Sequence, residues 1–161
     1  MRRIEKAAHA TVAFNRSISE GYRHLGIAAP GFPAGVRAGQ FVMVRSPWVG
    51  DPFLPRAFSV YRLSGRAGGA PVVEILYKIV GKGTRYLATL EAGQDLELLG
   101  PLGNSFTPPA PGGTAVLAAG GIGVPPIAAL ARELAGREGP GTLSPTPSPQ
   151  PPAPALEVFL G

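Results

Sequence analysis

The stretch Val72-Val-Glu-Ile-Leu-Tyr-Lys-Ile-Val-Gly-Lys-Gly-Thr-Arg-Tyr-Leu-Ala-Thr-Leu90 joins two patterns that decide how the rest of the chain is interpreted. Its first part, Val72–Val80, is rich in β-branched residues and predicts a long β-strand. Its last part, Thr84–Leu90, has apolar residues at helical spacing after a glycine-rich start and predicts a short helix. Where a strand runs through glycines into a helix, backbone N–H groups can approach an anion.

Short strands separated by turn residues surround this stretch. Further strands are predicted at residues 10–14, 22–27, 40–45, 57–61 and 95–99. Turn signals such as Pro30-Gly31 and Gly68-Gly69 lie between them. Several short strands with frequent turns favour a closed barrel over an open sheet. The sequence therefore predicts a six-stranded antiparallel β-barrel domain over residues 1–108.

The pattern changes after Pro108-Pro109. Residues 114–119 form a continuous apolar run, which is typical of a strand buried on both faces. A glycine-rich turn at 120–123 leads into a predicted helix at 124–134, whose early prolines are tolerated in a first helical turn. A second strand is predicted at 156–160. One strand–helix–strand unit needs further parallel strands, so residues 109–161 predict a truncated, parallel-sheet nucleotide-binding α/β domain.

Composition separates a folded part from a biased one. The 161 residues include 23 Gly and 19 Pro, yet 45% are hydrophobic and only 16% are charged, which does not suit a wholly disordered chain. Seven of the prolines lie in residues 139–154, which predicts a flexible insert. There is no cysteine, so disulfides, thiol nucleophiles and cysteine-ligated metals are excluded within these residues. His9 and His24 are far apart in sequence, and no metal site is expected.

The charge is uneven along the chain. The formal net charge is +5. Residues 1–110 hold 13 of the 15 basic and 7 of the 10 acidic residues, so the positive charge lies in this first part of the chain. This suits a ligand that carries phosphates, or a nucleic acid. Aromatic residues are only 7% of the chain and do not alternate with basic ones, so nucleic-acid binding is the weaker alternative. No secretory signal follows Met1, and glycines and prolines interrupt the longest apolar stretch, so a cytoplasmic protein with no membrane span is expected.

Three motifs could bind a nucleotide. Arg56-Ala-Phe-Ser59 offers a guanidinium for a phosphate, a ring for a flat ligand and a hydroxyl. Gly81-Lys-Gly-Thr84 opens the short helix; it lacks the P-loop spacing, and a simple glycine turn with Thr84 as N-cap is the alternative. Gly120-Gly-Ile-Gly123 precedes the second helix without a full Gly-x-Gly-x-x-Gly, and close strand–helix packing is its alternative. No pair of carboxylates suggests acid–base hydrolysis.

In this order, across a barrel and then a βα unit, the three motifs resemble the ferredoxin-reductase superfamily. Gly39-Gln-Phe-Val-Met43 also resembles the strand that precedes its flavin motif. More narrowly, Leu76–Thr84, Leu99-Gly-Pro-Leu-Gly-Asn104 and Ala119–Pro126 resemble the electron-transfer subunits of bacterial type B dihydroorotate dehydrogenases. The likeness covers residues 8–135 and resumes at 156–161. Related subunits of sulfide dehydrogenases, hydrogenases and transhydrogenases share these stretches and remain alternatives.

The resemblance implies two sets of binding residues and no catalytic acid, base or nucleophile. The residues expected to contact FAD are Arg56, Ala57, Phe58, Ser59, Leu76, Tyr77, Lys78, Gly83 and Thr84. Those expected to contact the nicotinamide nucleotide are Gly120, Gly121 and Gly123. The family's [2Fe–2S] cluster is held by four cysteines, which this chain lacks.

The resemblance also implies a function. Electrons from NADH would pass through FAD, and in the full-length family through a [2Fe–2S] cluster, to the catalytic dihydroorotate dehydrogenase subunit of pyrimidine biosynthesis, in a heterotetramer. The electron acceptor and the choice between NADH and NADPH stay open at this point.

Overall fold

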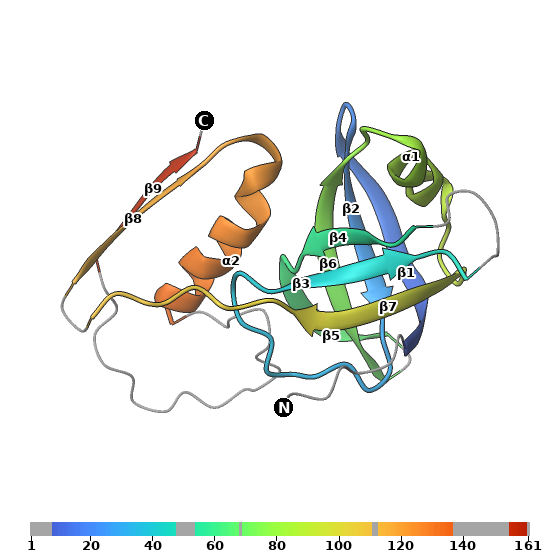
Figure 1. Ribbon diagram of the computed structural model, residues 1–161, viewed down its shortest axis with the longest axis horizontal. Helices are drawn as coiled ribbons and strands as arrows, with labels where there is room; N and C mark the ends of the chain where they lie inside the picture. The colour runs from blue at the N-terminus through green and yellow to red at the C-terminus, as the bar shows by residue number, and fades with distance from the viewer. Residues whose placement is uncertain (1–7, 48–53, 68, 111–112, 137–154, 161) are drawn as a thin grey trace.

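The computed structural model describes residues 8–47, 54–67, 69–110, 113–136 and 155–160. Figure 1 shows two parts side by side: a strongly curved antiparallel sheet with a short helix at one end, and a smaller part with one helix beside two strands. The predicted flexible insert at 139–154 lies outside the described residues.

Seven strands form the antiparallel sheet, in the order β4-β3-β7-β1-β2-β6-β5. Their bounds are β1 (Ala8–Ser19), β2 (Tyr22–Ala28), β3 (Phe41–Arg45), β4 (Arg56–Ser59), β5 (Arg62–Ala67), β6 (Ala70–Lys78) and β7 (Asp95–Leu102). The prediction of six strands was wrong by one, because β5 was not predicted. β5 carries Arg62, Ser64, Gly65 and Arg66, so its composition reads as a turn, and only its pairing with β6 makes it a strand.

The two edge strands are consecutive pieces of one segment, and this brings the ends of the sheet together. β4 pairs with β3, and β5 pairs with β6. Between them, Val60 N donates to Gln40 O at 3.0 Å and Tyr61 N donates to Glu74 O at 2.9 Å. The segment thus changes its pairing partner from β3 to β6 within two residues. Fewer backbone N–H and C=O groups are therefore left unpaired at the two edges of the sheet than in an open sheet.

The core lies inside the curved sheet. Strand residues alternate between its two faces, so every second side chain points inward. The buried inward side chains are mostly aliphatic: Val12, Leu25, Ile27, Val42, Val44, Val60, Val73, Ile75, Leu96 and Leu98.

Helix α1 (Lys82–Thr89) lies at one end of this sheet, close to the predicted bounds of 84–90. A side chain of β1 holds its C-terminal end: Asn15 Nδ2 donates to Leu87 O at 2.8 Å and to Leu90 O at 2.9 Å. Arg23 Nε in turn donates to Asn15 Oδ1 at 3.0 Å. Asn15 therefore gives the Leu90 carbonyl a donor and adds a second donor at the Leu87 carbonyl, which already accepts from Leu90 N, at an end where helix carbonyls need partners.

The smaller part contains β8 (Thr114–Ala119), the short 3₁₀ helix η1 (Gly121–Gly123), α2 (Val124–Leu134) and β9 (Ala155–Leu160). β8 and β9 are parallel, from Thr114 opposite Ala155 to Ala119 opposite Leu160. The predicted strand–helix–strand order is confirmed. The expectation that residues 114–119 are buried on both faces was wrong: Leu117 is buried, but Val116 is 65% exposed. Within the described residues α2 packs on one face of β8, and nothing covers the other.

Replacing Asn15 by Ala should lower the free energy of unfolding by about 1–3 kcal/mol, because the Leu87 and Leu90 carbonyls would lose the Asn15 amide as a donor in a partly buried place. Urea unfolding followed by circular dichroism measures this. Ser17→Ala, an exposed change on the same strand, is the control and should cost much less. Equal losses in the two variants would contradict the role of Asn15.

Candidate functional site

The first two motifs meet at the start of α1. Arg56 opens β4, and its guanidinium lies over Gly83, so a Cβ added to Gly83 would overlap the Nε and Cζ atoms of Arg56. Arg56 NH1 also donates to Leu54 O, which orients the side chain. An open pocket here is lined by Val44, Arg45, Ser46, Leu54, Arg56, Gly83, Tyr86 and Leu87. Residues 27 positions apart, as their numbers show, thus form one cationic site beside a helix N-terminus.

The turn before α1 is shaped by Thr84. Its hydroxyl accepts hydrogen bonds from Val80 N at 2.9 Å and Gly81 N at 3.0 Å, and donates to Gly81 O at 3.0 Å. The alternative that Thr84 is the N-cap was wrong: Gly81 is the N-cap and Thr84 lies in the first turn. Thr84 is buried, so its hydroxyl serves the turn, and its contribution to ligand binding would come from its backbone.

Some of the remaining residues that were expected to contact FAD are accessible, and others are buried. Ala57 and Lys78 are exposed, while Phe58, Ser59 and Leu76 are half-buried. Tyr77 is 1% exposed, and its ring lies 5.7 Å from that of Phe58, tilted by 59°. Burial raises the pKa of the Tyr77 hydroxyl, although the charge of Arg23 opposes this. Tyr77 can therefore reach a ligand only through its backbone, and its side chain supports Phe58.

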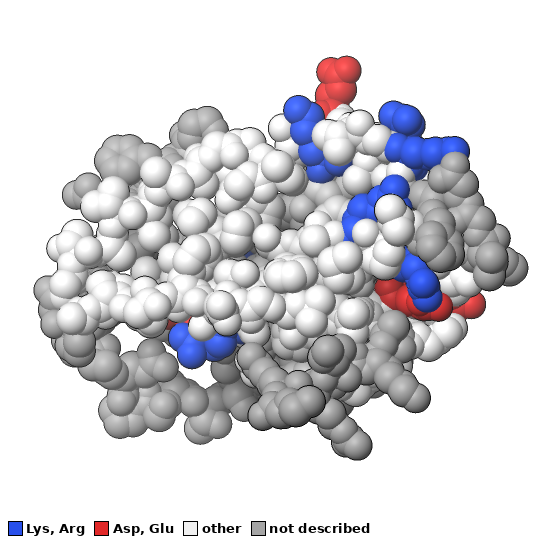
Figure 2. Space-filling model, in the orientation of Figure 1, with Lys and Arg blue, Asp and Glu red and all other residues white. Residues whose placement is uncertain are grey.

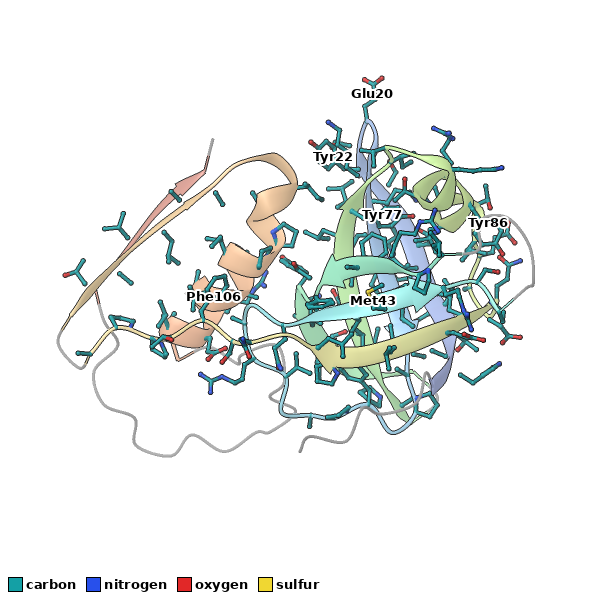
Figure 3. The ribbon with its side chains drawn as sticks, viewed as in Figure 1. Glu20, Tyr22, Met43, Tyr77, Tyr86 and Phe106 are labelled. Atoms are coloured by element: carbon teal, nitrogen blue, oxygen red, sulfur yellow. The ribbon has the colours of Figure 1, made fainter. Side chains whose placement is uncertain are left out.

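The third motif lies against the barrel at a residue that the sequence did not indicate. A Cβ on Gly121 would lie 3.9 Å from the hydroxyl oxygen of Tyr22, the first residue of β2. Lys78 Nζ lies 5.3 Å from the centroid of the Tyr22 ring. Tyr22 therefore lies between the end of β6 and the Gly120–Gly123 turn, as Figure 3 shows. No motif in the sequence surrounds Tyr22. Its place beside Lys78 follows from the register of β2 with β6, which pairs the two residues.

Lys and Arg side chains gather on the α1 side of the molecule. On the face shown in Figure 2 they lie over α1 and the adjoining strands, whereas the part around α2 and β8 is almost uncharged. Arg56 is half-buried among the groups at this end, and Lys82 and Arg85 are exposed. This distribution suits an anionic ligand near the start of α1.

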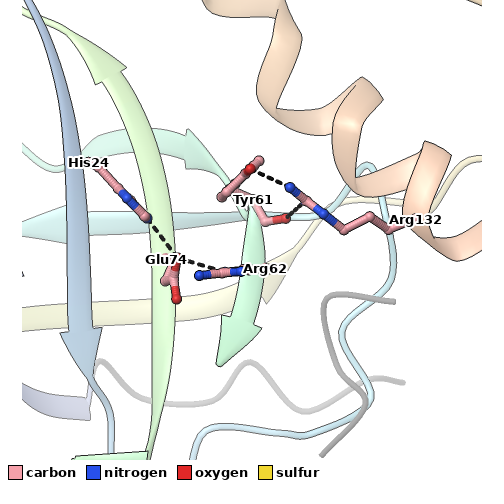
Figure 4. Close-up of polar contacts among 5 residues, drawn as sticks. All are labelled: His24, Tyr61, Arg62, Glu74 and Arg132. Carbon is pink, nitrogen blue, oxygen red and sulfur yellow. Dashed lines mark hydrogen bonds and ion pairs between the residues drawn. The ribbon is translucent and has the colours of Figure 1, made fainter. Parts of the chain in front are cut away.

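A buried carboxylate supports the strand that carries Leu76–Lys78. Glu74 is 1% exposed, and its Oε2 lies 2.6 Å from His24 Nε2 and 2.8 Å from Arg62 Nε (Figure 4). Burial raises the pKa of Glu74, but hydrogen bonds from His24, Arg62 and Ser64 and the charge of Arg62 outweigh it, lowering the pKa from 4.5 to about 2. The carboxylate thus stays ionised and joins β2, β5 and β6.

Two other kinds of site have no support in the described part of the chain. No group of three or more His, Asp or Glu side chains there could hold a metal ion. No helix among those residues is long and apolar enough to cross a membrane.

No protein-family model matches the chain. A dihydroorotate dehydrogenase B (NAD(+)) electron transfer subunit from Desulforamulus reducens is 43% identical over 97 residues, which are 60% of this chain and 36% of that protein. The subunit of the same name from Bacillus caldolyticus is 38% identical over 129 residues, 79% of this chain and 49% of that protein. The resemblance found in the sequence is confirmed.

Solved structures agree with these homologues. The cytochrome P450 reductase of Amycolatopsis superposes with a TM-score of 0.65 at 29% identity, covering 82% of this chain and 40% of that one. The ferredoxin reductase of a carbazole 1,9a-dioxygenase superposes with a TM-score of 0.67 at 24% identity, covering 96% and 42%. The fold of the antiparallel sheet is therefore that of ferredoxin reductases. The chain spans about half, or less, of the length of the curated relatives that it matches.

Glu74 should make stability depend on pH in acid. Because its folded pKa is about 2, below the ordinary 4.5, its contribution is complete above pH 4.5 and is lost as the pH falls toward 2. The contribution is about 3 kcal/mol. In Glu74→Gln, unfolding free energies measured from pH 6 to pH 2 should fall less steeply over this window than in the wild type.

The exposed change Glu91→Gln is the matched control and should keep the wild-type slope. If Glu74→Gln also kept that slope, the ionised state of Glu74 in the fold would be ruled out.

Proposed function

We propose that this chain binds FAD between Arg56 and the start of α1 and receives a nicotinamide nucleotide at Gly120–Gly123. The observation that carries the proposal is the contact of the Arg56 guanidinium with Gly83. A guanidinium beside a helix N-terminus offers paired donors and positive charge to the same phosphate group. Gly83 leaves room for both because it has no side chain.

The flat part of FAD would lie along β4 and the end of β6. Phe58 is half-buried and rests on Tyr77, so its ring has a fixed orientation. Ser59 adds a hydroxyl on the same strand, and Leu76 and Lys78 add backbone groups across the sheet. Tyr22 would complete this surface on the side of the Gly120–Gly123 turn, where the nicotinamide nucleotide would approach.

As the activity of the whole protein we propose electron transfer from NADH to the catalytic subunit of dihydroorotate dehydrogenase B in pyrimidine biosynthesis. The homologues that bear this name support it. FAD supplies the exchange between two-electron and one-electron transfer. The residues of this chain would bind and orient the cofactor and the nucleotide. The chain has no cysteine, so it could not hold an iron–sulfur cluster through thiolates.

We further propose that the catalytic subunit and this chain assemble as a heterotetramer, and that β8, α2 and β9 form part of a parallel-sheet nucleotide-binding domain. The parallel pairing of β8 with β9 supports the second statement. The glycine-rich turn at the carboxyl end of β8 is also where ligands bind in open parallel sheets.

Replacing Arg56 by Ala should weaken FAD binding by about 10- to 100-fold, because a charge-assisted hydrogen bond to phosphate contributes about 1.5–3 kcal/mol. Titration of the apoprotein with FAD, followed by flavin fluorescence, gives the dissociation constant. Gly83→Ala should weaken binding too, since its methyl group would displace the Arg56 side chain.

Arg16→Ala removes an exposed arginine of β1 that is not among the residues of the proposed FAD site, and is the control, expected to keep FAD affinity within about twofold. Wild-type affinity in Arg56→Ala would contradict the phosphate role. A wild-type chain that takes up no FAD would overturn the proposed function.

A further inference from the structure

Two consecutive residues of α2 attach this helix to two separate segments of the barrel. Arg132 NH1 donates to Tyr61 O at 3.3 Å, its NH2 donates to the Tyr61 hydroxyl, and its Cζ lies 4.2 Å from the centre of the Tyr61 ring (Figure 4). Glu133 accepts hydrogen bonds from Arg37 Nε at 2.5 Å and Ala38 N at 2.9 Å. Successive helical side chains point about 100° apart, so the two contacts resist rotation of α2.

The Tyr61 ring, on which Arg132 docks, is itself held in place by a neighbouring side chain of the barrel. The His24 ring meets the Tyr61 ring edge-on, with centroids 5.9 Å apart and planes at 90°. His24 is itself bound to the buried carboxylate of Glu74 at 2.6 Å. Arg132 therefore docks on a ring whose neighbour His24 is held by Glu74 on the outer face of the sheet. A guanidinium suits both stacking on that ring and donation to its hydroxyl.

Apolar contact between the parts is small by comparison. One buried cluster joins Ala38 of the barrel to Leu117, Ala129 and Leu130. Small side chains such as Ala38 and Ala129 allow close approach but leave little to interlock. The polar contacts of Arg132 and Glu133 therefore supply much of the directional restraint on α2.

The position of α2 decides the position of the Gly120–Gly123 turn, because the helix begins directly after it. Val124 and Arg132 are about 12 Å apart along the helix axis. Without the Arg132 contact, a tilt of about 10° around the far end would move the turn by about 2 Å, and a displacement of about 1 Å can slow a reaction about 100-fold.

We propose that Arg132, through Tyr61, is a positioning residue that sets the distance between the Gly120–Gly123 turn and the flavin-binding strands. In this role it acts through Tyr61 and the position of α2. This inference rests on the proposed function for its consequence in catalysis, but the attachment itself is testable without any ligand.

The first measurement is a distance between the two parts. The chain has no cysteine, so Ser17→Cys on β1 and Ala118→Cys on β8, both exposed, can carry a pair of spin labels. Pulsed electron paramagnetic resonance should give a narrow distribution of the distance between the two labels in the otherwise unchanged chain. Arg132→Met, which keeps the aliphatic stem, should broaden it, and Tyr61→Phe, which keeps the ring and the carbonyl, should broaden it less. Arg16→Met, at an exposed arginine of β1, is the matched control and should leave it unchanged.

The second measurement separates binding from reaction. Arg132→Met should keep the dissociation constant of FAD within about twofold, while the rate of flavin reduction by NADH in stopped flow falls at least about 10-fold. Broadened distances together with a slowed reduction support the proposal.

Unchanged distances, or broadened distances with an unchanged rate, would overturn it. A wild type that binds no FAD would overturn the proposed function instead, while the distance measurement would still decide whether Arg132 restrains α2.

Discussion

The pairing of one segment with both ends of the sheet is the constraint on which the rest of the structure depends. Residues 56–67 pair first with β3 and then with β6. The change of partner occurs at Val60 and Tyr61, whose N–H groups donate to Gln40 and Glu74. Arg56 at the start of the segment faces α1, and Tyr61 at its middle faces α2. The same backbone that closes the sheet therefore places one side chain for each half of the candidate site.

Glu74 holds the middle of that segment from the outer face of the sheet, opposite the face on which its neighbours Val73 and Ile75 enter the core. A buried carboxylate is costly unless charged and polar partners compensate for its lost hydration. Here Arg62 comes from the closing segment and His24 from β2, so the compensation also joins three strands. The edge-on packing of His24 against Tyr61 extends this arrangement to the ring on which Arg132 rests. Ionic and aromatic contacts thus connect strands β2, β5 and β6 to the surface that α2 covers.

Periodicity and turn residues were enough to predict most strands and both helices, because these features depend on neighbours in sequence. The helix at 124–134 and the strand at 114–119 were predicted with their observed bounds. β5 could not be predicted in this way, since its polar and glycine residues become a strand only through pairing with β6. The prediction that β8 is buried on both faces was wrong. Burial depends on which elements pack against a strand, and the apolar residues of the strand do not determine that.

The candidate site shows the same division. The motifs at Arg56, Gly83 and Gly120–Gly123 were found from local composition and from resemblance to a family. Their meeting with Tyr22, Tyr61 and Arg132 follows from strand register and helix docking, which join residues as far apart as Tyr22 and Gly121. The alternative role of Thr84 as N-cap was wrong, because the choice between capping a helix and bracing its first turn depends on backbone angles.

The exposed face of β8 has a consequence for how the molecule opens. The seven-stranded sheet shares one continuous core, whereas β8 and β9 form a two-stranded sheet with Val116 65% exposed. Two paired strands with one helix hold together weakly, while a curved sheet of this size unfolds cooperatively. Amide hydrogens in β8 and α2 should therefore exchange with solvent through local openings that leave the barrel intact. The part that contains β8 and α2 would then fluctuate around a seven-stranded sheet that stays folded.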